Sequence, residues 1–132
     1  MEIIIQPDSG AAASLAARLL AGIIRKKPDA VLGLATGGTT LPLYRELAAM
    51  KLDWRKITTF NLDEYVGISP QHPQSYHGFM RENLFRHVNI AAKNVNIPDG
   101  LTRDIPAFCE RYERKIRAAG GIDVQLLGIG TS

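Results

Sequence analysis

Two segments of this 132-residue chain combine residue types and spacing that could do chemistry. The first, Thr36-Gly37-Gly38-Thr39, joins an apolar run to a helical pattern, so its amides and the positive helix end can hold a phosphate. Its glycines also let the backbone approach a ligand, although a tight strand-to-helix turn would explain them too. The segment is neither a P-loop nor a dinucleotide fingerprint, because it lacks the Gly-Lys-Ser/Thr ending and the Gly-x-Gly-x-x-Gly spacing.

The second segment is an acidic pair, Asp63 and Glu64, at the end of the next predicted strand. Neighbouring residues of an extended chain point to opposite faces, so we expect only one of the two carboxylates to face a cleft. That carboxylate could move a proton between adjacent carbons of a sugar, if partial burial brings its pKa toward neutrality. The alternative is that the pair caps the following turn or meets an arginine.

Other residue types that often carry chemistry give weaker signals. Gly128-Ile129-Gly130 could bring backbone close to a ligand, but two glycines at a strand end do not define a site. His72, His77 and His87 are not at ligand spacing, so no metal site is predicted. The single cysteine, Cys109, cannot form an internal disulfide, which is typical of a reducing compartment, and it reads as a small apolar residue on a helix face.

Alternating strands and helices must position these segments. Cap candidates Asp8 and Ser9, Pro42, Ser75 and Pro106 each introduce a helical pattern. The predicted strands cover residues 2–5, 30–35, 57–62, 94–97 (a short edge strand) and 123–129 (a last buried strand). This alternation predicts an α/β fold, a Rossmann-like parallel sheet with helices on both faces. Ligands of such sheets bind at the carboxyl ends of the strands, where all three glycine-rich or acidic segments stand.

Composition narrows the function classes. With 45% hydrophobic residues the chain can form a globular core, and its length suits one domain. The 16 Lys and Arg residues exceed the 13 Asp and Glu residues by only three and form no basic stripe, so nucleic-acid binding is not predicted. No signal peptide and no apolar run of about 18 residues is present, so we expect no membrane contact and a cytoplasmic location.

Four motifs, LGLATGGTT, TFNLDEYVG, HPQSYHGFM and LLGIG, resemble in order and spacing those of glucosamine-6-phosphate deaminases along essentially the whole chain. The resemblance implies a modified Rossmann fold. It also implies a reaction that opens the ring of an amino-sugar phosphate, shifts a proton between C2 and C1, and releases ammonia to give fructose 6-phosphate. No metal or redox cofactor is implied, and the expected partner is a small sugar phosphate.

The resemblance also implies roles for individual residues. Asp63 looks like the enolisation base, and Gly128 falls where the family lines the sugar site with backbone. By the same resemblance, the loop around the substrate and its phosphate consists of Thr36, Gly37, Gly38 and Thr39. Glu64 receives no role from the resemblance.

The chain departs from the family pattern at its end. The family continues its GIG segment with Asp-Gly-His and Phe-Asn-Glu-Pro for ring opening, then with an Arg and a Lys for the phosphate, whereas Ser132 stands here where the Asp is expected. We therefore expect residues 1–132 to be the truncated N-terminal part of a single sugar-phosphate isomerase/deaminase domain. We also expect it to be inactive alone and prone to self-association through exposed apolar surface.

Two other functions stay open on the sequence. One is a sugar-lactone hydrolase of the 6-phosphogluconolactonase type, and the other is a non-catalytic remnant that binds a phosphosugar or a partner. DEYVG followed by HPQSY favours the deaminase, because lactonases usually show an Arg soon after their acidic pair.

Overall fold

Four parallel strands form the sheet of the computed structural model, which describes residues 1–130. In spatial order they are β3 (Val95–Asn96), β2 (Thr58–Asn61), β1 (Val31–Leu34) and β4 (Val124–Gln125). Leu34 lies opposite Asn61, so β1 and β2 finish level with each other. The predicted α/β, Rossmann-like parallel sheet is confirmed, and the segments that follow its two central strands start side by side.

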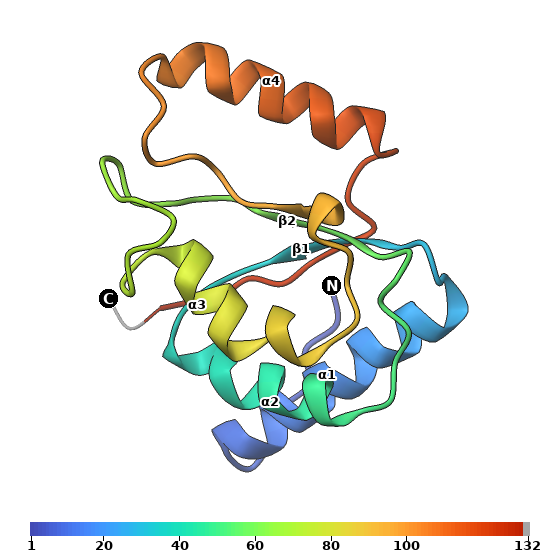
Figure 1. Ribbon diagram of the computed structural model, residues 1–132. Coiled ribbons are helices and arrows are strands. Elements are labelled where there is room, and N and C mark those ends of the chain that lie inside the picture. The colour runs from blue at the N-terminus through green and yellow to red at the C-terminus, as the bar shows by residue number, and fades with distance from the viewer. Residues whose placement is uncertain (131–132) are drawn as a thin grey trace.

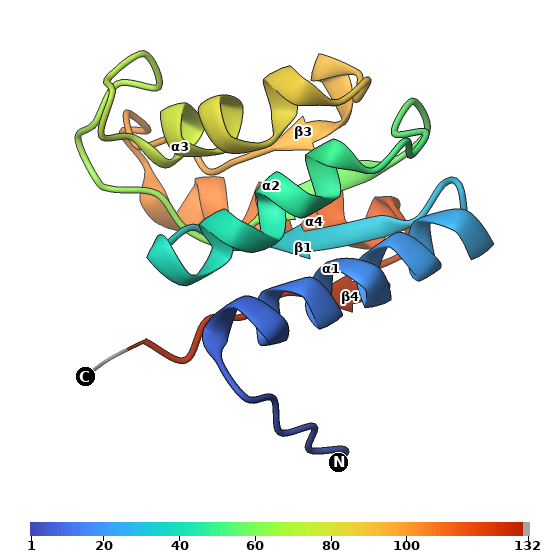
Figure 2. The same cartoon turned by 90° about the horizontal axis from the view of Figure 1, so that it is seen from below.

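Helices cover both faces of this sheet (Figure 1). Figure 2 shows three of them ranged across one face, whereas the fourth lies on the other. The first group is α1 (Ser9–Lys26), α2 (Leu41–Ala49) and α3 (Tyr76–Asn83), and the fourth helix is α4 (Ile105–Ala118). Short 3-10 helices complete the described residues: η1 (Gly38–Thr40), η2 (Phe85–His87) and η3 (Ala92–Asn94).

Local signals start and stop these helices. The side chains of Asp8, Ser75 and Asp104 each accept a hydrogen bond from the backbone amide three residues further on, at 2.7, 2.9 and 3.0 Å. Pro42 lies in the first turn of α2, where its missing N–H costs nothing. The helix starts predicted at Asp8, Pro42 and Ser75 are therefore confirmed, and Gly120, with a φ of 90°, follows the end of α4.

The hydrophobic core lies between the sheet and the layer of α1, α2 and α3. All four residues of β1 are buried, and Tyr44, Trp54 and Leu47 are fully buried beside them. The opposite face is thinner: Phe60 of β2 meets the Tyr112 ring of α4 edge to face, with centroids 5.7 Å apart. No residue of α4 is fully buried, so this helix is attached by a narrow stripe.

Two predicted strands differ from the structure. Residues 2–5 form no strand, and Ile5 is 88% exposed. A strand needs a neighbouring strand for its backbone hydrogen bonds, and among residues 1–130 none lies beside this segment. The last strand was predicted as buried over residues 123–129, but β4 is shorter and half-buried. It lies at the edge of the described sheet with only β1 beside it, and Leu127 is 69% exposed.

Candidate functional site

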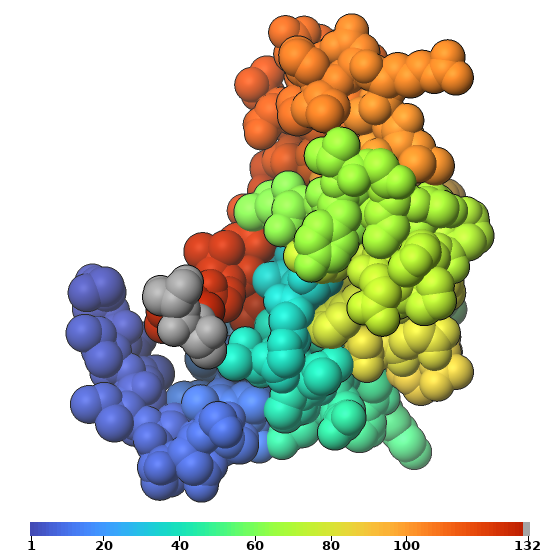
Figure 3. Space-filling view, turned by 90° about the vertical axis from the view of Figure 1, so that its left-hand side faces the viewer, coloured from blue at the N-terminus to red at the C-terminus, as the bar shows by residue number. Residues whose placement is uncertain are grey.

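An open cleft of about 670 Å³ lies at the carboxyl ends of β1, β2 and β4. Figure 3 looks onto this end of the molecule, where the segments that follow the three strands meet. The lining includes every site residue predicted from the sequence, namely Thr36, Gly37, Gly38, Thr39, Asp63 and Gly128. Leu34, Ala35, Leu62, Gln125, Leu127 and Gly130 complete it. The structure thus brings the three segments together in a hollow of the size usual for small-molecule sites.

The turn after β1 needs glycine at one position and leaves space at another. Gly37 has a φ of 122°, a conformation that side chains other than glycine rarely adopt. Its carbonyl oxygen accepts hydrogen bonds from the amide and the hydroxyl of Thr40, at 3.2 and 2.8 Å, which closes the turn. Gly38 has an ordinary φ, and a Cβ there would meet no heavy atom within 4 Å.

The amides of this turn are available to an anion. Within residues 1–130, no protein group accepts a hydrogen bond from the N–H of Gly37, Gly38 or Thr39. They precede α2, whose N-terminal end carries partial positive charge. Both the tight-turn explanation and the phosphate-binding explanation therefore have support, the first from Gly37 and the second from the open space at Gly38.

The two carboxylates of the acidic pair separate as predicted. Asp63 lines the cleft, whereas Glu64 does not. Partial burial was the condition for the proton-transfer role, and Asp63 does not meet it, because the residue is exposed. Within residues 1–130 its side chain makes no hydrogen bond to a protein group. An exposed, unengaged carboxylate is free to contact a ligand in the cleft.

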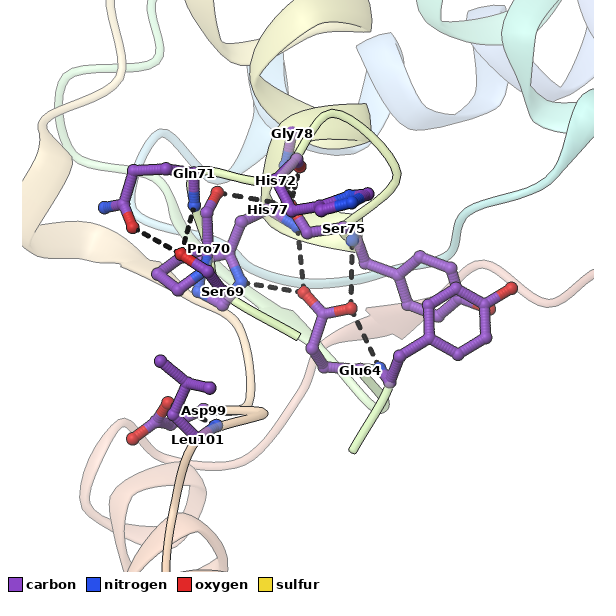
Figure 4. Close-up of polar contacts among 12 residues, drawn as sticks. Glu64, Ser69, Pro70, Gln71, His72, Ser75, His77, Gly78, Asp99 and Leu101 are labelled. Carbon is purple, nitrogen blue, oxygen red and sulfur yellow. Dashed lines mark hydrogen bonds and ion pairs between the residues drawn. The ribbon is translucent and has the colours of Figure 1, made fainter. Parts of the chain in front are cut away.

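Glu64 has the environment of a structural carboxylate (Figure 4). Its side chain is 1% exposed. One oxygen, Oε1, accepts from the amides of Tyr65 and Tyr76 at 2.9 and 3.0 Å. The other, Oε2, lies 3.2 Å from the His77 amide and 2.8 Å from His77 Nδ1. The alternative was that the acidic pair caps the following turn or meets an arginine. Glu64 instead caps the start of α3, twelve residues further on, and meets a histidine.

These contacts decide the charge of Glu64. Burial raises the pKa of its carboxyl, but hydrogen bonds from the Tyr76 amide, the His77 ring and the Tyr65 and His77 amides outweigh that effect. The pKa of Glu64 therefore lies below its ordinary value, and the carboxylate is ionised at neutral pH. Because an ionised carboxylate can only accept, the proton in the 2.8 Å contact belongs to His77 Nδ1.

Two tyrosines that the sequence did not single out stand beside the cleft. The rings of Tyr65 and Tyr76 lie with centroids 4.7 Å apart. The pKa of Tyr76 is raised, first by the Tyr65 side chain, then by burial and by the charges of Tyr65 and Asp63, while the Thr36 side chain lowers it. Tyr65 and Tyr76 line a hollow together with Thr36 and Gly37 of the turn after β1. The signal was present, since the two tyrosines belong to DEYVG and HPQSY.

A second hollow, of about 310 Å³, lies on the other side of Asp63, next to α4. Its lining contains four acidic residues, Asp63, Glu64, Asp99 and Glu113, and no Lys or Arg. Such a surface repels phosphate, so the first cleft is the better candidate for an anionic ligand.

Metal and membrane sites find no support among residues 1–130. No group of three or more His, Cys, Asp or Glu side chains is arranged to hold a metal ion. No described helix has the length and apolar character needed to cross a membrane. Cys109 is exposed on α4.

Known proteins are similar to this chain in both sequence and fold. Residues 9–132 match the family model described as glucosamine-6-phosphate isomerases/6-phosphogluconolactonase. The glucosamine-6-phosphate deaminase of Arthrobacter sp. (strain FB24) is 53% identical, over 99% of this chain and 52% of its own length. That of Halothermothrix orenii is 49% identical, over 98% of this chain and 56% of its own length.

Two solved structures give the same result. A monomeric glucosamine-6-phosphate deaminase superimposes with a TM-score of 0.95 at 42% identity, covering 98% of this chain and 56% of its own. The 6-phosphogluconolactonase of Thermotoga maritima reaches 0.78 at 28% identity, covering 98% of this chain and 59% of its own. The chain spans about half the length of the curated relatives it matches. With a match from residue 9 onward, the chain belongs to the family of glucosamine-6-phosphate isomerases and 6-phosphogluconolactonases.

Proposed function

We propose that this chain carries the enolisation site of a glucosamine-6-phosphate deaminase, an enzyme that converts glucosamine 6-phosphate and water into fructose 6-phosphate and ammonia. The observation that supports it most directly is that the exposed carboxylate of Asp63 and the open turn at Gly38 border one cleft. Deaminases are also the relatives with the higher identity.

In this proposal the phosphate lies against the turn of residues 36–39, where amide donors and the positive end of α2 attract it. The sugar extends toward Asp63, with the backbone at Gly128 beside it. Because substrate and carboxylate are held together, proton transfer becomes effectively intramolecular.

The step assigned to Asp63 is proton transfer on the open-chain sugar. Its carboxylate takes the proton from C2, and the electron pair of the broken C2–H bond forms a C1–C2 double bond while O1 gains a proton. Return of a proton to C1 leaves an imine at C2. Addition of water to C2 then releases the nitrogen as ammonia.

The deciding experiment is hydrogen exchange at C2. In deuterated water a small open-chain fraction of glucosamine 6-phosphate forms without a catalyst, so the Asp63 step can be observed separately from ring opening. We expect the chain to introduce deuterium at C2 faster than buffer does and Asp63→Asn to remove that excess. Equal exchange by both proteins would contradict the proposal, and saturable binding without exchange would indicate the phosphosugar-binding alternative.

The runner-up is a 6-phosphogluconolactonase-type hydrolase. The solved lactonase is less similar than the solved deaminase, at 28% against 42% identity. Hydrolysis of 6-phosphogluconolactone without any C2 exchange would favour the lactonase function over the deaminase function. Since phosphorylated sugars are charged and retained inside cells, a cytoplasmic location would suit either reaction.

A further inference from the structure

The Glu64 carboxylate joins two segments that the chain separates by a loop. Tyr65 begins this loop, and Tyr76 and His77 form the first turn of α3 at its far end. Glu64 accepts amide hydrogen bonds from all three of these residues, at 2.9, 3.0 and 3.2 Å (Figure 4). One buried carboxylate therefore closes the loop at both ends.

Capping alone does not account for this arrangement. Ser75 already caps α3, with its hydroxyl oxygen accepting from the Gly78 amide at 2.9 Å. Glu64 instead takes the amides of Tyr76 and His77, which come earlier in the helix than the amide that Ser75 satisfies. Two caps from different segments thus serve one helix end, and Glu64 connects that end by hydrogen bonds to the strand-end segment of the cleft.

The connection determines what faces the cleft. Asp63 precedes Glu64, so burial of one side chain turns the other to the opposite face. On the other side of the loop, Tyr76 is held through its amide and lines a hollow together with Thr36 and Gly37. Rotation of Glu64 out of its pocket would release both ends together.

We propose that Glu64 is a positioning residue: by joining the β2 end to the α3 N-terminus, it holds Asp63 in the cleft opposite the turn of residues 36–39. This inference rests on the proposed function, because Asp63 is the group whose placement matters. Glu64 itself touches neither the cleft nor a ligand in it.

The test compares two variants of the 132-residue chain that each remove one cap of α3. Glu64→Gln keeps the size but replaces the acceptor oxygen that faces His77 with an NH₂ group, so it removes the contacts with His77 and weakens the link. Ser75→Ala removes the other cap and leaves the Glu64 contacts intact. Both lower the midpoint of thermal unfolding, which makes Ser75→Ala the matched structural control.

The expected result is a separation of the two variants in C2 exchange. Glu64→Gln should slow exchange about 10- to 100-fold, because a small misplacement of a reacting group has effects of that size. Apparent affinity for the sugar phosphate should change little, since the turn of residues 36–39 is untouched. Ser75→Ala should exchange like the wild type, and Glu64→Asp, which keeps the charge on a shorter arm, should lie between. Equal loss in Ser75→Ala and Glu64→Gln would overturn the proposal.

A second readout keeps this inference separate from the proposed function. NMR of the Asp63 carboxyl carbon, with nuclear Overhauser contacts between Asp63, Tyr76 and Thr36, reports placement without turnover. We expect Glu64→Gln to change these signals and Ser75→Ala to preserve them. If the wild type shows no exchange, the proposed function fails. The positioning role is then supported if Glu64→Gln changes the Asp63 signals, and it is contradicted if they stay as in the wild type.

Discussion

The hydroxyl of Tyr112 on α4 donates to the carbonyl oxygen of Asn61, the last residue of β2, at 2.5 Å. The same hydroxyl lies 3.0 Å from the carbonyl oxygen of Asn96 in β3. Burial raises the pKa of Tyr112, so the phenol stays protonated and able to donate across the neutral range. Since no residue of α4 is fully buried, this contact is a principal attachment of the helix to the sheet.

Tyr112→Phe should therefore destabilise the protein while keeping the ring contact with Phe60. Loss of the hydroxyl removes the single donor that two strand-end carbonyl groups share, which we expect to cost about 1 to 3 kcal/mol. Urea unfolding followed by circular dichroism measures the loss. Tyr112→Leu, which also removes the edge-to-face contact, should cost more. An unchanged midpoint in Tyr112→Phe would show that α4 is held in another way.

Gly37 and Gly38 should respond differently to alanine. Gly37→Ala forces a side chain into a φ of 122° and should lose roughly 1 to 3 kcal/mol of stability. Gly38→Ala meets neither strain nor a clash, so folding should be preserved. Its methyl group would enter the cleft and weaken sugar-phosphate binding, measured by calorimetry. Retained affinity in a folded Gly38→Ala would place the phosphate elsewhere.

Asp123 should contribute to stability through a backbone contact more than through its ion pair. Its Oδ2 accepts from the Val31 amide at 2.8 Å, and its Oδ1 lies 2.9 Å from Lys27 Nζ. The Lys27 side chain is 52% exposed, so Lys27→Met should change the free energy of unfolding little. Asp123→Ala removes the acceptor of the Val31 amide and should lower the free energy of unfolding more. Similar losses in the two variants would contradict this ranking.

Acid should weaken the Glu64 link in a defined direction. Its folded pKa lies below the ordinary value of 4.5, so its contribution to stability is fully present above that value. The contribution is lost as pH falls from 4.5 through the lower folded pKa. Between about pH 5 and pH 3 the wild type should lose more unfolding free energy than Glu64→Gln, in which this group cannot titrate. Parallel stability curves for the two proteins would show that Glu64 is not linked to folding.

Exposed apolar residues beyond β4 should drive self-association. Leu127 and Ile129 are exposed next to an edge strand, and such edges pair readily with other chains. Leu127→Lys with Ile129→Lys should lower the association measured by sedimentation velocity across a concentration series. Leu101→Lys, at an exposed leucine away from β4, is the control. A concentration-independent monomer in the wild type would refute the expectation.

Local signals in the sequence determined the elements that depend on near neighbours. Ser75 caps α3 through the backbone amide of Gly78, only three residues further on. Pro42 lies in the first turn of α2, a position that its ring suits. The apolar run through β1 predicts a buried strand without knowledge of its partners, because a strand covered on both faces is apolar throughout. From these the parallel sheet follows, and with it the meeting of Gly38, Asp63 and Gly128 at one edge.

The tertiary structure decided what depends on segments distant in the chain. Residues 2–5 have strand composition but no neighbouring strand among the described residues, so their pattern is not realised. The sequence placed Asp63 and Glu64 on opposite faces, but only the fold shows which carboxylate is exposed and which is buried. Glu64 finds its partners twelve and thirteen positions away, at the start of α3, and that contact turns Asp63 toward the cleft. Burial and hydrogen bonding between remote segments depend on how the chain packs, so a local sequence pattern cannot predict them.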